Sequence, residues 1–225
     1  MRRIFAIAPL LLLVACSGEN VDAAKVLRDG GAAMGQLNTV AATLKLTKGT
    51  VSIEGFRLIS ARTSVRLPAD SDTLYTMKEQ DVSFSLQVVI AAGHTYVHVP
   101  FSQFQEVTGD QAKAFPDMAR LFDPSTGLPA VIPQGTDPKY VTTEQVDGHD
   151  CYQVTATYTA AQVRGLLSEL DSSGPVGAHV WVGKSDHLIR KAVLVGQFGD
   201  DGSPATVEVS ISSFNGPVVI TSPTP

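Results

Sequence analysis

The sequence predicts an α+β protein, with one large antiparallel β-sheet and two or three helices, and three observations lead to this prediction. Apolar and polar residues alternate with a period of two along many segments, which is typical of strands with one buried face. Turn sequences such as Asp147-Gly148 join consecutive segments and favour hairpins. Helical spacing of apolar residues occurs before the first strand and after Tyr158. A large twisted sheet curls, so its inner face needs cover.

The first predicted helix extends from about residue 20 to residue 38. Its apolar residues recur at steps of three and four: Val21, Ala24, Leu27, Gly31, Met34 and Leu37. Gly30 and Gly31 weaken this helix by about 1 kcal/mol each relative to alanine, so it depends on tertiary packing. Thr159 is a suitable N-cap for a second helix, whose apolar residues are Val163, Leu166, Leu167 and Leu170.

The predicted strands follow one another along the rest of the chain. They are residues 40–46, 59–67, 82–90, 97–99, 140–146, 151–158, 177–183, 187–195 and 205–211, with a short one at 218–220. Asp70, Asp72 and the run Asp200-Asp201-Gly202 are expected in polar turns. Residues 100–139 are expected to be irregular, because they hold six of the 13 prolines. A long irregular segment with apolar content is typical of a lid, rim or binding loop.

Composition excludes several classes of protein. The 225 residues include 17 basic and 22 acidic side chains, a formal net charge of −5, which leaves no basic stripe for nucleic acid. Hydrophobic residues make up 44% and charged residues 17%, as in a folded domain. The chain has two cysteines, Cys16 and Cys151, which excludes a disulfide framework.

The N-terminus indicates export. Arg2 and Arg3 precede an apolar run, residues 4–14, that is too short to span a bilayer as a helix. The run ends in Leu13-Val14-Ala15-Cys16, which resembles a bacterial lipobox. We therefore expect residues 1–15 to be a signal peptide, Cys16 to be lipidated and residues 16–20 to form a short tether. The protein would be anchored on the extracytoplasmic face of the plasma membrane. The alternative is an ordinary signal peptide with a coincidental cysteine.

The second cysteine, Cys151, lies in a predicted strand. We expect it to be a small packed side chain, because no lysine or arginine within three positions would lower the pKa of its thiol. A reactive thiol is the alternative.

A family resemblance extends along nearly all of residues 21–221, with residues 222–225 expected to be a flexible tail. It is densest from residue 121 onward. Besides the lipobox, it rests on AMGQLNTV (33–40), LFDPSTGL (121–128), EQVDG (144–148), YQVT (152–155), VWV (180–182), DHLIRKA (186–192) and SFNGPV (213–218). Together these segments resemble the LppX–LprAFG lipoproteins of mycobacteria and related actinobacteria.

The resemblance implies a curved antiparallel half-barrel, similar in shape to LolA and LolB, with helices on its concave face enclosing a hydrophobic cavity. Members of the family bind multi-acylated lipids or glycolipids and assist their transfer from the plasma membrane towards the outer envelope. It further implies a membrane export transporter as a partner. We expect a monomer that needs no cofactor and binds no nucleic acid.

The cavity of such a carrier should be lined by inward-facing aliphatic side chains, with polar contacts kept to its mouth. Our candidates are Leu44, Leu46, Ile59, Val65, Phe84, Leu86, Val88, Val97, Val99, Val154, Val163, Leu167, Val180, Val193 and Val207. Rim or lid candidates are Phe101, Phe104, Leu121 and Phe122. For each cavity candidate the alternative is an ordinary place in a filled core.

Catalysis has little support in the sequence, and we expect the protein not to be an enzyme. It lacks a Gly-x-Ser-x-Gly elbow, a His-Glu-x-x-His motif and a P-loop. We expect no metal site, because His94 and His98 would lie roughly 13 Å apart along one strand; a weak calcium site at the acidic turns stays open. The other functional reading is a structural or interaction lipoprotein with a filled core that scaffolds an envelope transporter or enzyme. A void distinguishes the two readings.

Overall fold

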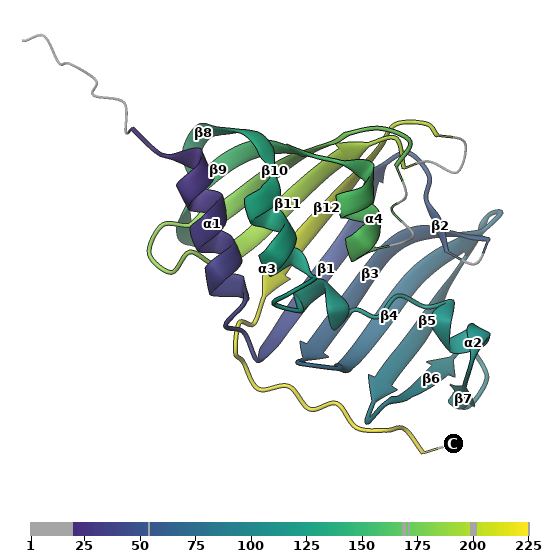
Figure 1. Cartoon of the computed structure of the whole chain (residues 1–225). Coiled ribbons are helices and arrows are strands. Elements are labelled where there is room, and N and C mark those ends of the chain that lie inside the picture. The colour runs from purple at the N-terminus through teal and green to yellow at the C-terminus, as the bar shows by residue number, and fades with distance from the viewer. Residues whose placement is uncertain (1–19, 54, 168–169, 171, 199–201, 225) are drawn as a thin grey trace, which may run out of the picture.

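Twelve strands pair in one antiparallel sheet in the computed structural model, which describes residues 20–53, 55–167, 170, 172–198 and 202–224. The sheet is curved and open, and the helices lie on its concave side (Figure 1). The predicted fold class is therefore confirmed. The expected signal peptide, Cys16 and most of the expected tether lie outside the described residues.

Two groups of strands build the sheet. The first comprises β1 (Thr39–Lys48), β2 (Ser52–Ile53), β3 (Phe56–Arg66), β4 (Asp70–Glu79), β5 (Val82–Ala91), β6 (His94–His98) and β7 (Gln105–Val107). The second comprises β8 (Thr136–Val146), β9 (His149–Tyr158), β10 (Val176–Gly183), β11 (Ile189–Gly196) and β12 (Ala205–Ser212). Their order is β7-β6-β5-β4-β3-β1-β12-β11-β10-β9-β8, with β2 paired to β3, so the pairing of β1 with β12 joins the two groups.

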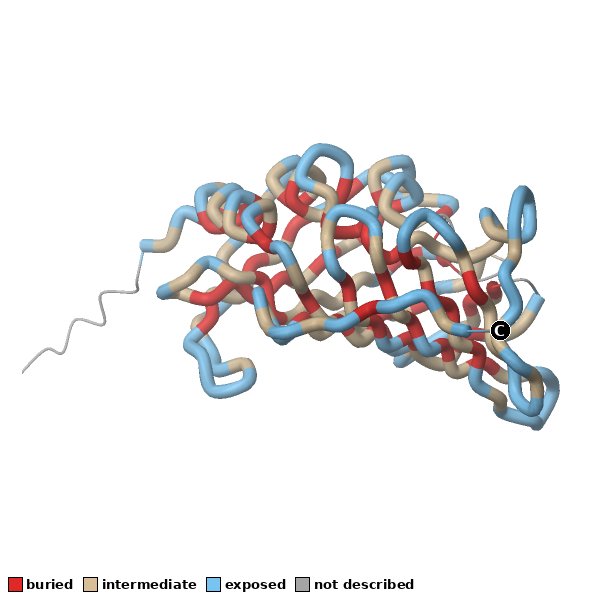
Figure 2. Tube along the Cα trace, turned by 90° about the horizontal axis from the view of Figure 1, so that it is seen from below, coloured by how far each residue is buried: buried red, intermediate tan, exposed pale blue. Residues whose placement is uncertain are grey.

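The cover of the concave face comes from α1 (Ala23–Met34), α2 (Asp110–Lys113), α3 (Leu128–Val131) and α4 (Ala160–Leu166), with 3₁₀ turns η1 (Arg120–Phe122) and η2 (Ile132–Gln134). Because β7 and β8 lie at opposite edges of the sheet, the chain between them must cross the concave face. The proline-containing middle of the sequence is thus a covering segment, and Figure 2 shows the buried positions gathered between it and the strands.

The first helix is shorter than predicted. It begins after Asp22, whose side chain accepts a hydrogen bond from the backbone N of Lys25, and it ends at Met34, with Gly35 as its C-cap. Gly31, which weakens the helix in isolation, is required by packing: a Cβ there would lie 2.6 Å from the carbonyl O of Pro129 in α3. None of the helices in the described ranges is long and apolar enough to cross a membrane.

Strand β4 was not predicted. The polar-turn prediction for Asp70 and Asp72 is wrong, since both lie in this strand. The carboxylate of Asp70 pairs with Arg66 at 2.6 Å, and that of Asp72 accepts a hydrogen bond from Gln87 at 2.7 Å. These partners allow aspartates in a strand. The predicted turn at Asp200-Asp201 falls outside the described residues.

The predicted strand at 218–220 is also wrong, because these residues pair with no strand. Instead the C-terminal segment packs against the convex face. Ile220 is buried with Val89 and Tyr96, and its carbonyl accepts a hydrogen bond from Arg66 at 3.2 Å. The apolar residues at 218–220 therefore indicated a buried segment but not a paired strand.

Candidate functional site

An apolar cavity of about 90 Å³ lies between the concave face of the sheet and the covering segments. Its floor comes from β1, β3 and β9–β12, and its cover from η1, α3 and α4. The lining is Ala42, Leu44, Ala61, Thr63, Met118, Leu121, Phe122, Leu128, Val131, Ile132, Tyr158, Val163, Leu166, Leu167, Leu170, Ala178, Val180, Ile189, Ala192, Leu194, Val209 and Ile211.

Small side chains open the floor of the cavity. Four strands each contribute an alanine to the floor, and each alanine is paired across the sheet with a larger apolar residue. The alanines are Ala42, Ala61, Ala178 and Ala192. An alanine cannot fill the space between the sheet and its cover, so a void remains where several of them meet. The cavity thus results from alanines at inward-facing strand positions.

The cover is positioned by two local motifs. The carboxylate of Asp123 accepts hydrogen bonds from Ser125 and Thr126, through both backbone N–H and hydroxyl groups, and these bonds lower the pKa of Asp123 to about 2. This turn separates Leu121 and Phe122, which face the cavity, from α3. Thr159 caps the N-terminus of helix α4 in a capping box, which confirms the predicted N-cap.

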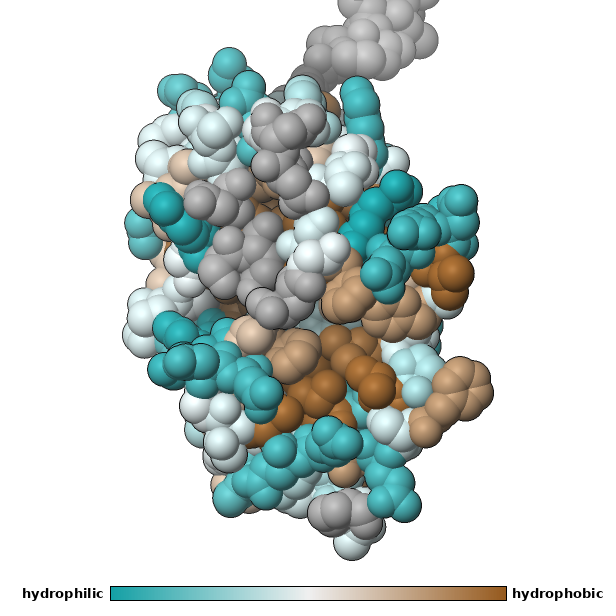
Figure 3. Space-filling model, turned by 90° about the vertical axis from the view of Figure 1, so that its right-hand side faces the viewer, coloured by the Kyte–Doolittle hydropathy of each residue, from teal (hydrophilic) through white to brown (hydrophobic). Residues whose placement is uncertain are grey.

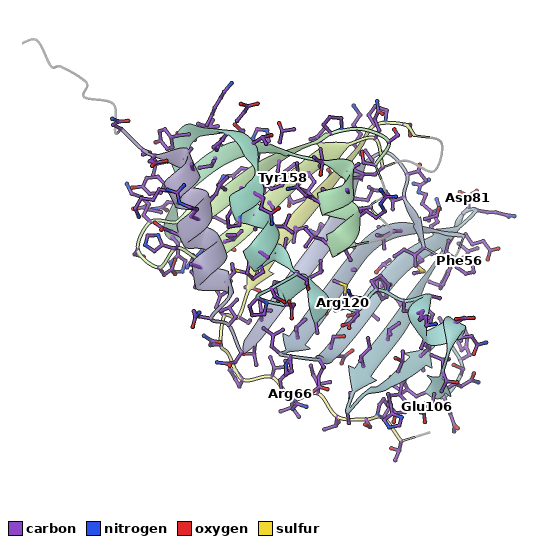
Figure 4. The ribbon with its side chains drawn as sticks, viewed as in Figure 1. Phe56, Arg66, Asp81, Glu106, Arg120 and Tyr158 are labelled. Carbon is purple, nitrogen blue, oxygen red and sulfur yellow. The ribbon has the colours of Figure 1, made fainter. Side chains whose placement is uncertain are left out.

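The two polar side chains of the lining have partners in the protein. The hydroxyl of Tyr158 donates a hydrogen bond to the carbonyl of Ile132 at 2.9 Å and so ties β9 to η2. Burial raises the pKa of Tyr158 well above its ordinary value. The hydroxyl of Thr63 lies 2.8 Å from that of Thr73. Figure 4 shows Tyr158 inside the covered part of the molecule. With no charged residue in the described lining, the cavity suits hydrocarbon.

The structure brings a minority of the predicted cavity residues to this site. Leu44, Val163, Leu167 and Val180 line it, together with the rim candidates Leu121 and Phe122. Val97 and Val99 line a second pocket, of about 230 Å³, between β6, β7 and α2.

The other cavity candidates lie elsewhere. Those buried in the core without lining the cavity are Val65, Leu86, Val88, Val154 and Val207, while Leu46 and Phe84 pack beside them partly buried. Ile59 sits at a β-bulge between Leu58 and Ser60. Val193 pairs with His179 and Glu208 on the convex side of the sheet.

The remaining rim candidates also lie away from the cavity. Phe101 is fully exposed after β6, and Phe104 packs against the convex-face cluster of Val89 and Tyr96. The sequence reasoning missed the alanines and the contributions of α3 and the residues around it, because it selected larger apolar residues, most of them on predicted strands.

The thiol of Cys151 is fully buried and donates a hydrogen bond to the carbonyl of His149 at 3.4 Å. Burial raises the pKa of this thiol, and a buried protonated thiol is a poor nucleophile. The structure thus places Cys151 as the small packed side chain expected from the sequence, away from the cavity lining.

Among proteins of known name, the chain resembles the lipoarabinomannan carrier protein LprG of Mycolicibacterium hassiacum, with 26% identity over 156 residues, 69% of this chain and 64% of the relative. The protein of the same name from Mycobacterium tuberculosis is 27% identical over 108 residues, 48% of this chain and 44% of the relative. The matched region therefore spans less than two thirds of each relative.

Solved structures agree on the fold. LprF from Mycobacterium bovis superimposes with a TM-score of 0.71 at 18% identity, covering 90% of this chain and 97% of LprF. The lipoprotein LppX from Mycobacterium tuberculosis gives 0.64 at 20% identity, covering 88% and 97%. The sequence also matches the LppX_LprAFG lipoprotein model over residues 22–220. This chain is therefore a member of the LppX_LprAFG lipoprotein family.

Proposed function

We propose that this protein binds multi-acylated lipids or glycolipids in the cavity under α3 and α4 and assists their transfer from the plasma membrane towards the outer envelope. The observation that carries the proposal is an apolar cavity, free of charged side chains, on the concave face of the sheet. The names of the LprG relatives, lipoarabinomannan carriers, support an acylated cargo.

Energetics favour an apolar cavity for such a carrier. Removing acyl chains from water is worth about 0.8 kcal/mol per methylene, and a membrane supplies the same amount as a protein cavity. A lipid therefore exchanges between the two only when they bind it about equally. A lining made mainly of aliphatic side chains meets that condition, because it adds no charged group that would trap the chains.

The cavity must widen to accept its cargo. An apolar cavity of about 150 Å³ holds one benzene molecule, so the observed volume of about 90 Å³ is too small for a pair of acyl chains. We propose that α4 moves outward when lipid enters. Its residues Val163, Leu166 and Leu167 cover the cavity, and Gln162 links it to Gln134 by a hydrogen bond of 3.2 Å between exposed amides.

We further propose that lipidated Cys16 anchors the protein on the extracytoplasmic face of the plasma membrane. Val21 is the fifth residue after Cys16, which gives the tether a reach of under roughly 18 Å. So short a tether favours local loading and hand-off to a membrane export transporter. In this proposal the protein binds and transfers its cargo without catalysing a reaction.

Native mass spectrometry of the full chain purified from an actinobacterial host, followed by solvent extraction, tests the proposal. We expect stoichiometric multi-acyl lipid on the parent protein and on the control Ala41→Trp, whose side chain lies on the opposite face of β1 from Ala42. We expect Ala178→Trp, which fills the cavity floor, to lose nearly all of it. A folded, lipid-free parent protein would contradict the proposal and favour the alternative, an interaction lipoprotein.

A further inference from the structure

The second pocket lies on the same concave face as the cavity. Directly paired residues share a face of a sheet, and one transverse row runs through Ala42, Thr63, Thr73, Val88 and Val97. Ala42 and Thr63 line the cavity, and Val97 lines the second pocket. Thr63 and Val97 are three strands apart, which corresponds to about 14 Å across the sheet.

A continuous piece of chain also connects the two sites. Phe115 lines the second pocket and Met118 lines the cavity. Three residues span at most about 11 Å, so the chain between α2 and η1 passes from one lining to the other within that length. Figure 3 views the end of the molecule that carries β6, β7 and α2, and apolar residues there gather in a hollow bordered by polar ones.

The second pocket has a different chemistry from the cavity. Its lining is Val97, Val99, Ser102, Gln105, Val107, Gln111, Ala114 and Phe115. Its valines and phenylalanine form an apolar surface, while two side-chain amides and one hydroxyl supply polar groups. No residue of this lining is charged. The side-chain amides of Gln105 and Gln111 make no hydrogen bond within the described part of the chain. Each can donate two hydrogen bonds and accept two.

Charged side chains next to this pocket are paired with one another and lie outside its lining. Glu106 accepts from His94 at 2.7 Å, and Asp110 pairs with Lys113 at 3.0 Å. The lining itself therefore offers no counter-charge to a phosphate, a carboxylate or an ammonium group. Its amides match groups that both donate and accept, and its apolar side chains match a C–H surface.

We infer that the pocket between β6, β7 and α2 binds an uncharged glycosyl group of the cargo lipid, while the acyl chains occupy the cavity. A sugar ring carries hydroxyls at its edges and C–H groups on its faces, which is the pairing that Gln105, Gln111 and the Val97–Phe115 surface offer. The inference rests on the proposed function, and it assigns the cargo class as neutral glycolipid.

The test compares two lipids with identical acyl chains, dipalmitoylglycerol and galactosyl-dipalmitoylglycerol, by competition on the full chain in native mass spectrometry. We expect the parent protein to prefer the galactosyl lipid at least about fivefold, as hydrogen bonds to both amides require. The double variant Gln105→Ala/Gln111→Ala should bind both lipids equally. The control Gln103→Ala, an exposed glutamine beside the pocket but outside its lining, should keep the preference.

The contrary outcomes are distinct. If the parent binds both lipids equally, or if its preference survives in the double variant, the glycosyl site is overturned and the proposed function stands. If the parent binds neither lipid, the proposed function and this inference fail together. Binding of methyl galactoside alone, without a preference between the two lipids, would also overturn the assignment to a lipid-linked sugar.

Discussion

Two regions of the concave face share the same alternation of apolar and polar residues along their strands, but they differ in how tightly their side chains pack. The cavity region, over β1 and β10–β12, has Ala42, Ala61, Ala178 and Ala192 among its inward residues and contains a void. The packed region, over β4, β5 and the start of β3, presents Leu58, Tyr75, Met77 and Leu86, which are nearly fully buried. The difference shows that residue size, rather than the apolar alternation, decides where this sheet is hollow.

The two regions are also held together differently. The packed region gains its stability from side chains that contact one another, as in the edge-to-face rings of Phe56 and Phe84, 5.1 Å apart. The cavity region has polar links at its margins. Arg190 pairs with Asp186 at 2.6 Å at the end of the β10–β11 hairpin, and Lys191 pairs with Glu208 at 2.9 Å on the convex face.

The largest single loss of stability should come from truncating a leucine, a change that can be made in both regions. Leu58→Ala in the packed region should lower the free energy of unfolding by about 4 kcal/mol, within the range for a buried leucine. Leu44→Ala should cost about 1 kcal/mol less, because Leu44 already faces a void and loses fewer contacts. Urea unfolding of the lipid-free full chain measures both, and equal losses would contradict the comparison.

The sequence predicted the sheet better than the site. Periodicity reports which side of a strand is buried, so most strands and the capped helix after Thr159 were found. It missed β4, because Asp70 and Asp72 read as turn residues without knowledge of their partners Arg66 and Gln87. Such partners become neighbours only when strands pair.

The cavity could be predicted only in part for a related reason. Large inward residues such as Val65 and Leu86 fill space, while the void lies beside alanines whose significance depends on what faces them. Here the facing groups come from the covering segment around α3, which contributes Leu128 and Val131 from far along the chain. A local sequence pattern cannot show which distant residues will face a given strand position.

The next effect concerns the ion pair at the margin of the cavity region. Arg190 is buried, so Asp186→Asn leaves an unpaired guanidinium and should cost about 2–3 kcal/mol after allowance for the partly exposed carboxylate. The control Glu208→Gln, from the more exposed pair with Lys191, should cost under about 1 kcal/mol. Similar losses in the two variants would show that the cavity region does not depend on its buried pair.

This ion pair also gives a pH dependence. Hydrogen bonds from Arg190 hold the pKa of Asp186 below its ordinary value of 3.8. A lowered folded pKa means that the stabilisation is complete above pH 3.8 and is lost as the pH falls through the folded value. The difference in unfolding free energy between the parent and Asp186→Asn should therefore be constant near neutral pH and shrink below pH 3.8. A difference that persists unchanged in acid would assign the effect to something other than the charge.

The smallest effect on stability is expected when a buried valine is enlarged to leucine in each region, instead of a leucine being truncated. Val65→Leu, at a fully buried position of the core outside the cavity, should destabilise the lipid-free chain by about 1–2 kcal/mol, because the added methylene has no space. Val180→Leu makes the same change at the cavity and should be neutral or stabilising by up to about 1 kcal/mol, because the methylene enters the void. The loss of β-branching is common to both variants, so it cancels in the comparison. If Val180→Leu is as costly as Val65→Leu in urea unfolding, the cavity region is packed in solution and the distinction between the two regions fails.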